Sequence, residues 1–172
     1  GKPLIYANSA FYKMSGYNSD EVIGRNCRFL QNDDRDQEAI GTMANAIERG
    51  KPCQVELRNY KKDGTLFWNE ITITPVHNDL GGLTHFIGVQ NDVTERKREE
   101  LLKDSVRRIL EQIANGESLT DVATAIIETA EGHFEGSLAS ILLLDKERRT
   151  LHKLAAPNLP EGFGKGIEGA RI

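Results

Sequence analysis

Three segments in the middle of the chain alternate polar and apolar residues with a period of two, and this pattern limits the fold more than any other feature. The first covers residues 54–60, and segments 66–76 and 83–93 follow it. Alternation of this kind is typical of strands that bury one face. Asp63 and Gly64, between the first two segments, tolerate the positive φ that a hairpin turn needs. The sequence therefore predicts a three-stranded antiparallel meander.

The part before the meander has mostly helical spacing, interrupted by glycines that end helices. It predicts one brief strand and three helices, at residues 4–7, 9–15, 19–23 and 34–47. An antiparallel sheet with short helices on one face is an α+β fold.

From residue 94 the composition changes to a charged run that ends at residue 100. Leu102, Val106, Ile109 and Ile113 then recur at spacings of four, three and four, which is a heptad seam on a helix expected to end near residue 116. Two interpretations are open. The helix could cover the sheet of its own domain, or it could pair with a second copy of the chain. The charged flanks and the length of the seam favour pairing.

A second unit is expected after this helix. Ser118 and Asp121 resemble a capping box that begins another amphipathic helix. Segments 138–144 and 151–155 read as a strand and its return strand. One helix and two strands are too little to close a core, so we expect this unit to be cut short.

Composition excludes several classes of function. The 172 residues are 38% hydrophobic and 28% charged, which is typical of a soluble globular protein. The longest apolar stretch is far shorter than the about 20 residues that cross a bilayer, and no signal peptide is visible. The net charge of −4, without a large basic block, gives no indication of nucleic-acid binding.

Cys27 and Cys53 make no disulfide framework and fit a reducing cytoplasm. The four histidines show no metal-ligand spacing with them.

Residues 24–31, which read GRNCRFLQ, place a thiol beside a guanidinium group. Arg28 could clamp a phosphate or a carboxylate through two hydrogen bonds. The cation would also bias the thiol of Cys27 toward reactivity. A cysteine taken alone is more often a small buried hydrophobe, so both interpretations are open at this point. The GKGIEG run at 164–169 has the form of a dinucleotide-binding motif, but prolines rather than a strand precede it, and we reject that interpretation.

The 24–31 run is similar to the signature of LOV domains, the flavin-binding blue-light branch of the PAS superfamily. Further matching segments follow in the order of the family: NY at 59–60, KDG at 62–64, FWN at 67–69, FIGVQ at 86–90 and DVT at 92–94. The resemblance covers residues 4–94 and implies a PAS/LOV fold over 1–93, with the coupling helix at 94–116. Residues 117–172 resemble the N-terminal part of a GAF domain.

The resemblance implies a role for each matching residue. Cys27 is expected to form a reversible thioether with flavin carbon C4a after blue-light excitation, and Arg28 to pair with the flavin phosphate. Gln90 is expected to donate to flavin N5 in the dark and to rearrange when N5 is protonated. The expected contacts to the polar edge of the ring are Gln31, Asn59 and Asn69, with Asn26 as a weaker contact, and the expected apolar lining is Leu30, Ile71, Ile73 and Phe86.

One position departs from the family. LOV domains commonly carry a second phosphate-binding arginine where this chain has Ala44. Because a charged hydrogen bond contributes about 1.5–3 kcal/mol, we expect weaker flavin affinity or phosphate selectivity unless Arg35 compensates.

The resulting hypothesis is a cytoplasmic blue-light photoreceptor module that binds FMN, with FAD and riboflavin less favoured. It would form a homodimer through the 94–116 helix and signal to an output domain in cis, such as a histidine kinase or a diguanylate cyclase. No catalytic domain is expected within the chain. The alternatives are a flavin redox sensor and a ligand-free PAS interaction module.

Overall fold

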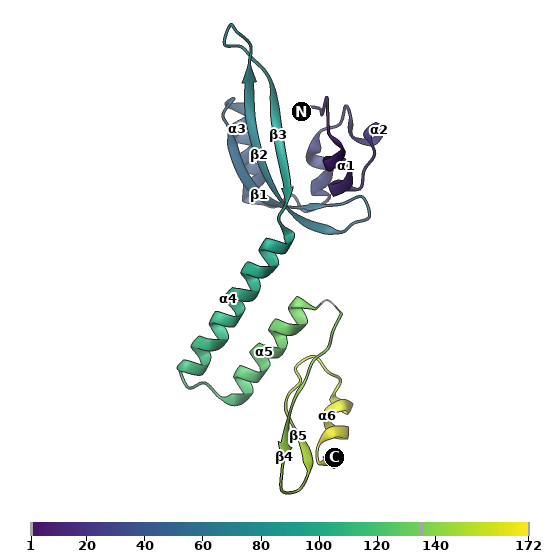
Figure 1. Cartoon of the computed structure of the whole chain (residues 1–172), viewed down its shortest axis with the longest axis vertical. Coiled ribbons are helices and arrows are strands. Elements are labelled where there is room, and N and C mark those ends of the chain that lie inside the picture. The colour runs from purple at the N-terminus through teal and green to yellow at the C-terminus, as the bar shows by residue number, and fades with distance from the viewer. Residues whose placement is uncertain (1, 135, 172) are drawn as a thin grey trace. The chain divides into compact units, whose positions relative to one another are not determined.

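The computed structural model describes residues 2–134 and 136–171, and it divides into two compact units, Gly1–Lys97 and Arg98–Ile172. Each unit has its own sheet (Figure 1).

The first unit is built on the predicted meander. Strands β1 (Cys53–Tyr60), β2 (Leu66–His77) and β3 (Leu83–Asp92) form an antiparallel sheet in the order β1-β2-β3. In the register, Val55 lies opposite Ile71, which in turn lies opposite Gln90. Gly64 takes a φ of 87° in the β1–β2 turn, the positive value that made Asp-Gly a turn signal.

Four short helices precede the sheet: α1 (Ser9–Ser15), α2 (Ser19–Val22), the 3-10 helix η1 (Cys27–Gln31) and α3 (Glu38–Glu48). Gly16 ends α1 in the left-handed conformation, with φ 76°, as its position predicted. Asn18 and Glu21 form a capping box at the start of α2.

Two predictions for this region are wrong. Residues 4–7 form no strand: Leu4 exchanges backbone hydrogen bonds of 2.8 Å with Gly24 and Arg25, and Ile5 and Tyr6 are each 75% exposed. The long helix begins at Glu38 rather than at residue 34. Residues 34–37 stay outside it because polar groups of this segment are hydrogen-bonded to β1.

The core of the first unit lies on one face of the sheet. Val55, Leu57, Ile71 and Ile73 are its buried members. Partly buried residues of α3 pack against them, namely Ala39, Ile40, Met43 and Ile47. Alternate residues of β1 and β2 are buried on this face, as the period of two predicted.

The last strand passes directly into helix α4 (Thr94–Ala114). The Thr94 hydroxyl accepts a 2.9 Å hydrogen bond from the Trp68 backbone N–H, and Asp92 accepts one of 3.0 Å from the Thr94 N–H. On the outer face of the sheet, Arg96 lies 2.7 Å from Glu56. The first turn of α4 is therefore attached to the sheet of the first unit.

The second unit contains the rest of α4 and a smaller set of elements: α5 (Leu119–His133), β4 (Ile141–Asp145), β5 (Thr150–Ala155), α6 (Glu161–Ile167) and β6 (Ala170–Arg171). The Ser118 hydroxyl accepts from the Asp121 N–H and caps α5, as predicted. Ala123, Ile127 and Ala155 form a small core of their own. No helix in the described ranges is both long enough and apolar enough to cross a bilayer.

Because the two cores are separate, we expect core substitutions to act on separate unfolding transitions. Leu57 and Ile127 are each 1% exposed. Leu57→Ala should lower the free energy of unfolding of the first unit by about 2–5 kcal/mol, the usual cost of a cavity of this size. Trp68, the single tryptophan of the chain, reports that transition by fluorescence in a urea titration.

Ile127→Ala should instead lower the urea concentration at which the second unit loses its far-ultraviolet circular dichroism signal. The Trp68 transition should stay within about 0.5 kcal/mol of the parent. An equal shift of the Trp68 transition by both variants would show that the units unfold as one.

Candidate functional site

Three amide side chains lie side by side on the packed face of the sheet, one from each strand. Asn69 of β2 donates through Nδ2 to Asn59 Oδ1 of β1 at 2.9 Å and to Gln90 Oε1 of β3 at 2.8 Å. Asn59 is 2% exposed and Asn69 is 0% exposed. Hydrogen bonds within the row offset part of the cost of burying these amides.

The row has a polar atom left over. Asn69 Oδ1 is buried and accepts no hydrogen bond. A buried acceptor without a donor costs about 1–3 kcal/mol, and almost all such groups in proteins are satisfied. The row therefore presents an acceptor to a ligand that carries an N–H or O–H donor.

Cys27, the first residue of η1, is half-buried. Burial raises the pKa of the Cys27 thiol above its ordinary value, and an interaction with the Gln90 side chain opposes that rise. The expectation that Arg28 would bias the thiol toward the reactive thiolate is therefore wrong. Desolvation dominates here, and it favours the protonated thiol.

The Arg28 side chain is exposed and lies beside an open cleft. Its Nε donates to Asn26 Oδ1 at 3.2 Å, and the same oxygen accepts from the Arg28 backbone N–H at 3.1 Å. Pro3, Gly24, Asn26 and Arg28 line the cleft, whose volume is about 460 Å³. Asn26 thus caps η1 and holds the guanidinium at the cleft, where it can bind an anionic group.

The remaining predicted site residues occupy two places. Leu30 and Gln31 are buried at the end of η1, at 1% and 8% exposure. Ile71 and Ile73 belong to the core cluster, and Phe86 packs against it from β3. Hydrogen bonds thus join Asn59, Asn69 and Gln90, and the Gln90 side chain lies near enough to Cys27 to lower the pKa of its thiol. The apolar residues lie on the same sheet face or on η1.

Neither Ala44 nor Arg35 is among the residues that line the cleft beside Arg28. Ala44 is exposed on α3. The Arg35 Nε donates to the Asn32 carbonyl at 3.2 Å, within its own loop. Among the described residues, Arg28 is the arginine that lines the cleft.

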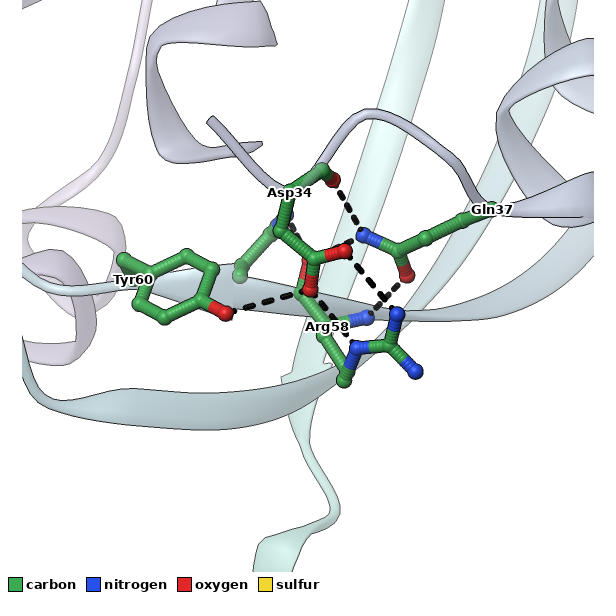
Figure 2. A network of polar contacts seen from close by, with 5 residues as sticks. Asp34, Gln37, Arg58 and Tyr60 are labelled. Atoms are coloured by element: carbon green, nitrogen blue, oxygen red, sulfur yellow. Dashed lines mark hydrogen bonds and ion pairs between the residues drawn. The ribbon is translucent and has the colours of Figure 1, made fainter. Parts of the chain in front are cut away.

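Sequence patterns did not identify one group of polar residues that borders the site. Asp34 binds the Arg58 guanidinium through two hydrogen bonds, of 2.7 and 2.9 Å, and accepts from the Tyr60 hydroxyl at 3.1 Å (Figure 2). Gln37 contacts the backbone of Arg58. The guanidinium beside it holds the pKa of the Asp34 carboxyl below its usual range. No spacing rule connects residues that lie more than twenty positions apart, so only the fold reveals this cluster.

Two curated relatives are similar to this chain over more than half of its length. A blue-light-activated histidine kinase of Brucella canis is 49% identical over 92 residues, which are 54% of this chain and 19% of that protein. The bacterioopsin transcriptional activator of Halobacterium salinarum is 38% identical over 134 residues, 76% of this chain and 20% of that protein. The chain thus spans about a fifth of the length of these relatives.

Solved structures resemble the first unit. The light-state structure of the Aureochrome1 LOV photoreceptor has a TM-score of 0.54 and 37% identity, over 59% of this chain and 80% of that chain. An RNA-binding light-oxygen-voltage receptor has a TM-score of 0.53 and 47% identity, over 55% of this chain and 26% of that chain.

The family assignment follows from the sequence model that describes the PAS domain. It matches residues 1–95, more than half of the chain. These residues contain η1, the whole amide row and the three-stranded sheet. The chain belongs to the PAS domain family, and it has LOV domains among its homologues.

Proposed function

We propose that the chain is a blue-light-sensing module that binds FMN and whose Cys27 bonds reversibly to the flavin. One observation carries the proposal: the amide row ends at Gln90, whose side chain interacts with the Cys27 thiol, and Asn69 Oδ1 of the same row is buried without a donor. A thiol beside a buried polar row that still needs a donor is the arrangement that such a module needs.

The residues present fit a flavin. When bound, FMN supplies blue-light absorption and a C4a–N5 double bond across which a thiol can add, sulfur to carbon and proton to nitrogen. The pyrimidine edge of a flavin carries an N–H between two carbonyls, and amides offer both acceptors and donors to such an edge without a charge. Asn69 Oδ1 would accept the N–H, and Arg28 at the cleft would bind the phosphate. This phosphate contact favours FMN over riboflavin.

The protonation state of the thiol suits this chemistry. Addition across a double bond uses both the sulfur and its proton. Burial raises the pKa of Cys27 and so keeps the proton on the sulfur at neutral pH. Interaction with the Gln90 side chain limits the rise.

The relatives support a sensory role with the output in cis. The Brucella relative is named a blue-light-activated histidine kinase, and its 92-residue match is about the length of the PAS region. The Halobacterium match is 134 residues long, longer than the 95 residues of the PAS region, so it continues beyond that region. A histidine kinase is therefore one candidate output, and transcriptional activation is a second that this longer match favours. In either case we propose that this chain is the cytoplasmic sensory segment and contains no catalytic domain.

We further propose the organisation set out from the sequence: a LOV domain at 1–93, a coupling helix at 94–116 and the N-terminal part of a GAF domain at 117–172. The helix would connect two copies of the chain. Part of its seam faces α5, because Leu102, Val106 and Ile109 line an apolar cleft of about 470 Å³ together with α5 residues such as Ile126 and Ala130. Val106 and Ile113 nevertheless stay 45% and 54% exposed, which leaves apolar surface for a partner copy.

Cys27→Ala should bind flavin as the parent does but should not bleach reversibly, because the amide row and Arg28 are intact and only the thiol is lost. The measurement is the absorption near the blue flavin band, before and after illumination and during recovery in darkness. A variant that bleaches and recovers like the parent would disprove the assignment. A parent without a flavin band would favour the ligand-free alternative, and flavin whose dark reduction alone changes the output would favour the redox sensor.

Gln90→Leu should raise the pH midpoint of Cys27 alkylation, because it removes the side-chain interaction that lowers the thiol pKa. The measurement is the rate of iodoacetamide labelling against pH, in darkness and in a Cys53→Ser background. A midpoint that is unchanged or lower would contradict the contact, whatever the labelling rate at a single pH.

Light should change disulfide cross-linking between copies when a cysteine is placed at Val106, and Gln90→Leu should blunt that change by at least about half while Cys27 still bleaches. The physical route runs from Gln90 along β3 into α4, and packed helix pairs tend to have discrete arrangements. The matched control is a cysteine at Glu111, on the opposite face of α4. A full light response in Gln90→Leu, or an equal response at position 111, would exclude this route.

A further inference from the structure

The amide row continues beyond the site to a backbone carbonyl that is held in place. The Arg58 carbonyl accepts from Asn59 Nδ2 at 2.8 Å and from Gln37 Nε2 at 3.1 Å. The Arg58 N–H donates to Gln37 Oε1 at 2.7 Å. The Gln37 amide therefore pairs with both backbone groups of Arg58, as a neighbouring strand would pair with the edge strand β1.

The rest of the cluster fixes Gln37 and Arg58 relative to each other. Gln37 Nε2 also donates to the Asp34 carbonyl at 2.8 Å, and the Asp34 carboxylate holds the Arg58 guanidinium in the two-bond geometry shown in Figure 2. Paired charge-assisted bonds of this kind are stronger and more directional than neutral ones. Residues 34–37 follow η1 closely in the chain, so the cluster fastens the Cys27-bearing segment to the strand that carries Asn59.

The direction of every bond in the row follows from this anchor. Asn59 must turn its NH₂ toward the Arg58 carbonyl, so its oxygen faces Asn69. Asn69 turns its NH₂ toward both neighbours, so Gln90 presents its oxygen to Asn69. The NH₂ of Gln90 is then directed away from Asn69 and is the donor that the dark state requires.

Reversal of Gln90 conflicts with the same anchor. It would place the Gln90 NH₂ against the Asn69 NH₂, and donor against donor makes no bond. Relief by reversal of Asn69 and then of Asn59 would bring the Asn59 oxygen against the Arg58 carbonyl, where two acceptors face each other without a hydrogen. The conflict can be moved along the row but not removed while the carbonyl stays fixed.

We infer that Gln37 is a positioning residue: by holding the Arg58 carbonyl it sets the polarity of the Asn59–Asn69–Gln90 row and biases Gln90 toward its dark orientation. The inference rests on the proposed photochemistry for its consequence, which is faster return to the dark state. The bond pattern itself does not depend on that photochemistry.

The test uses the full chain with FMN, in a comparison of the parent with Gln37→Leu. Gln37→Leu should slow dark recovery about fivefold, which is about 1 kcal/mol in the barrier. In darkness it should also speed the solvent exchange of the Asn59 side-chain NH₂, followed by ¹⁵N NMR. Gln54→Leu is the matched control, since Gln54 is an exposed glutamine of the same strand on the outer face of the sheet, and it should change neither quantity.

Gln37→Glu is the second variant and covers the case in which Gln37→Leu does not fold. It retains an acceptor for the Arg58 N–H and loses the donor to the Arg58 carbonyl. It should therefore also slow dark recovery and speed the exchange of the Asn59 side-chain NH₂. Unchanged Asn59 exchange in the folded variant overturns the inference even if no chain bleaches, which separates its failure from that of the photochemistry. Faster exchange with an unchanged or faster recovery overturns the proposed bias on Gln90.

Discussion

The site depends on the register of the three-stranded sheet. Because side chains alternate between faces, the pairing that puts Val55 opposite Ile71 also puts Asn59, Asn69 and Gln90 on the face covered by α3. A slip of one residue would move the amides to the outer face and bury Glu56 and Glu70. Burial of the aliphatic residues therefore fixes the strand register, and this register fixes the amide row on the packed face.

Much of this arrangement could be predicted from the sequence, and for a definite reason. Alternation in 54–60 and 66–76 reports directly which residues share a face, so the meander and the buried face were predicted correctly. The likeness of residues 24–31 to the LOV signature predicted roles for Cys27 and its neighbours, and these roles stay predictions. The structure joins Asn59, Asn69 and Gln90, which the same likeness predicted as site residues, by hydrogen bonds.

The errors occurred where side chains override local propensity. Residues 34–37 have helical spacing, but Asp34 and Gln37 bond to Arg58 rather than to a helical turn, and a pattern within one segment cannot show a partner that lies in another. The thiol of Cys27 was expected to be activated by Arg28 because the two are adjacent in sequence. Adjacent side chains on a 3-10 helix point in different directions, and burial then outweighs a cation that is turned toward Asn26.

The polar contacts on the two faces of the sheet differ in how much free energy is lost when they break. On the packed face, the amide row is buried, and any bond that is lost leaves a desolvated group that costs about 1–3 kcal/mol. On the outer face, Arg96 contacts Glu56 and Glu70, with side chains that are 45%, 28% and 23% exposed. Ion pairs this exposed contribute on the order of 0–1 kcal/mol each.

A rearrangement that begins at Gln90 therefore meets its largest resistance within the row and its smallest at the first turn of α4. Gln90 and Asp92 lie two residues apart on the same strand, and Asp92 caps the helix through Thr94. A strand shift that the packed face resists would act on the exposed contacts of Arg96 with Glu56 and Glu70. We propose that the difference in burial between the two faces, rather than any single strong contact, would direct a change at the thiol toward the helix.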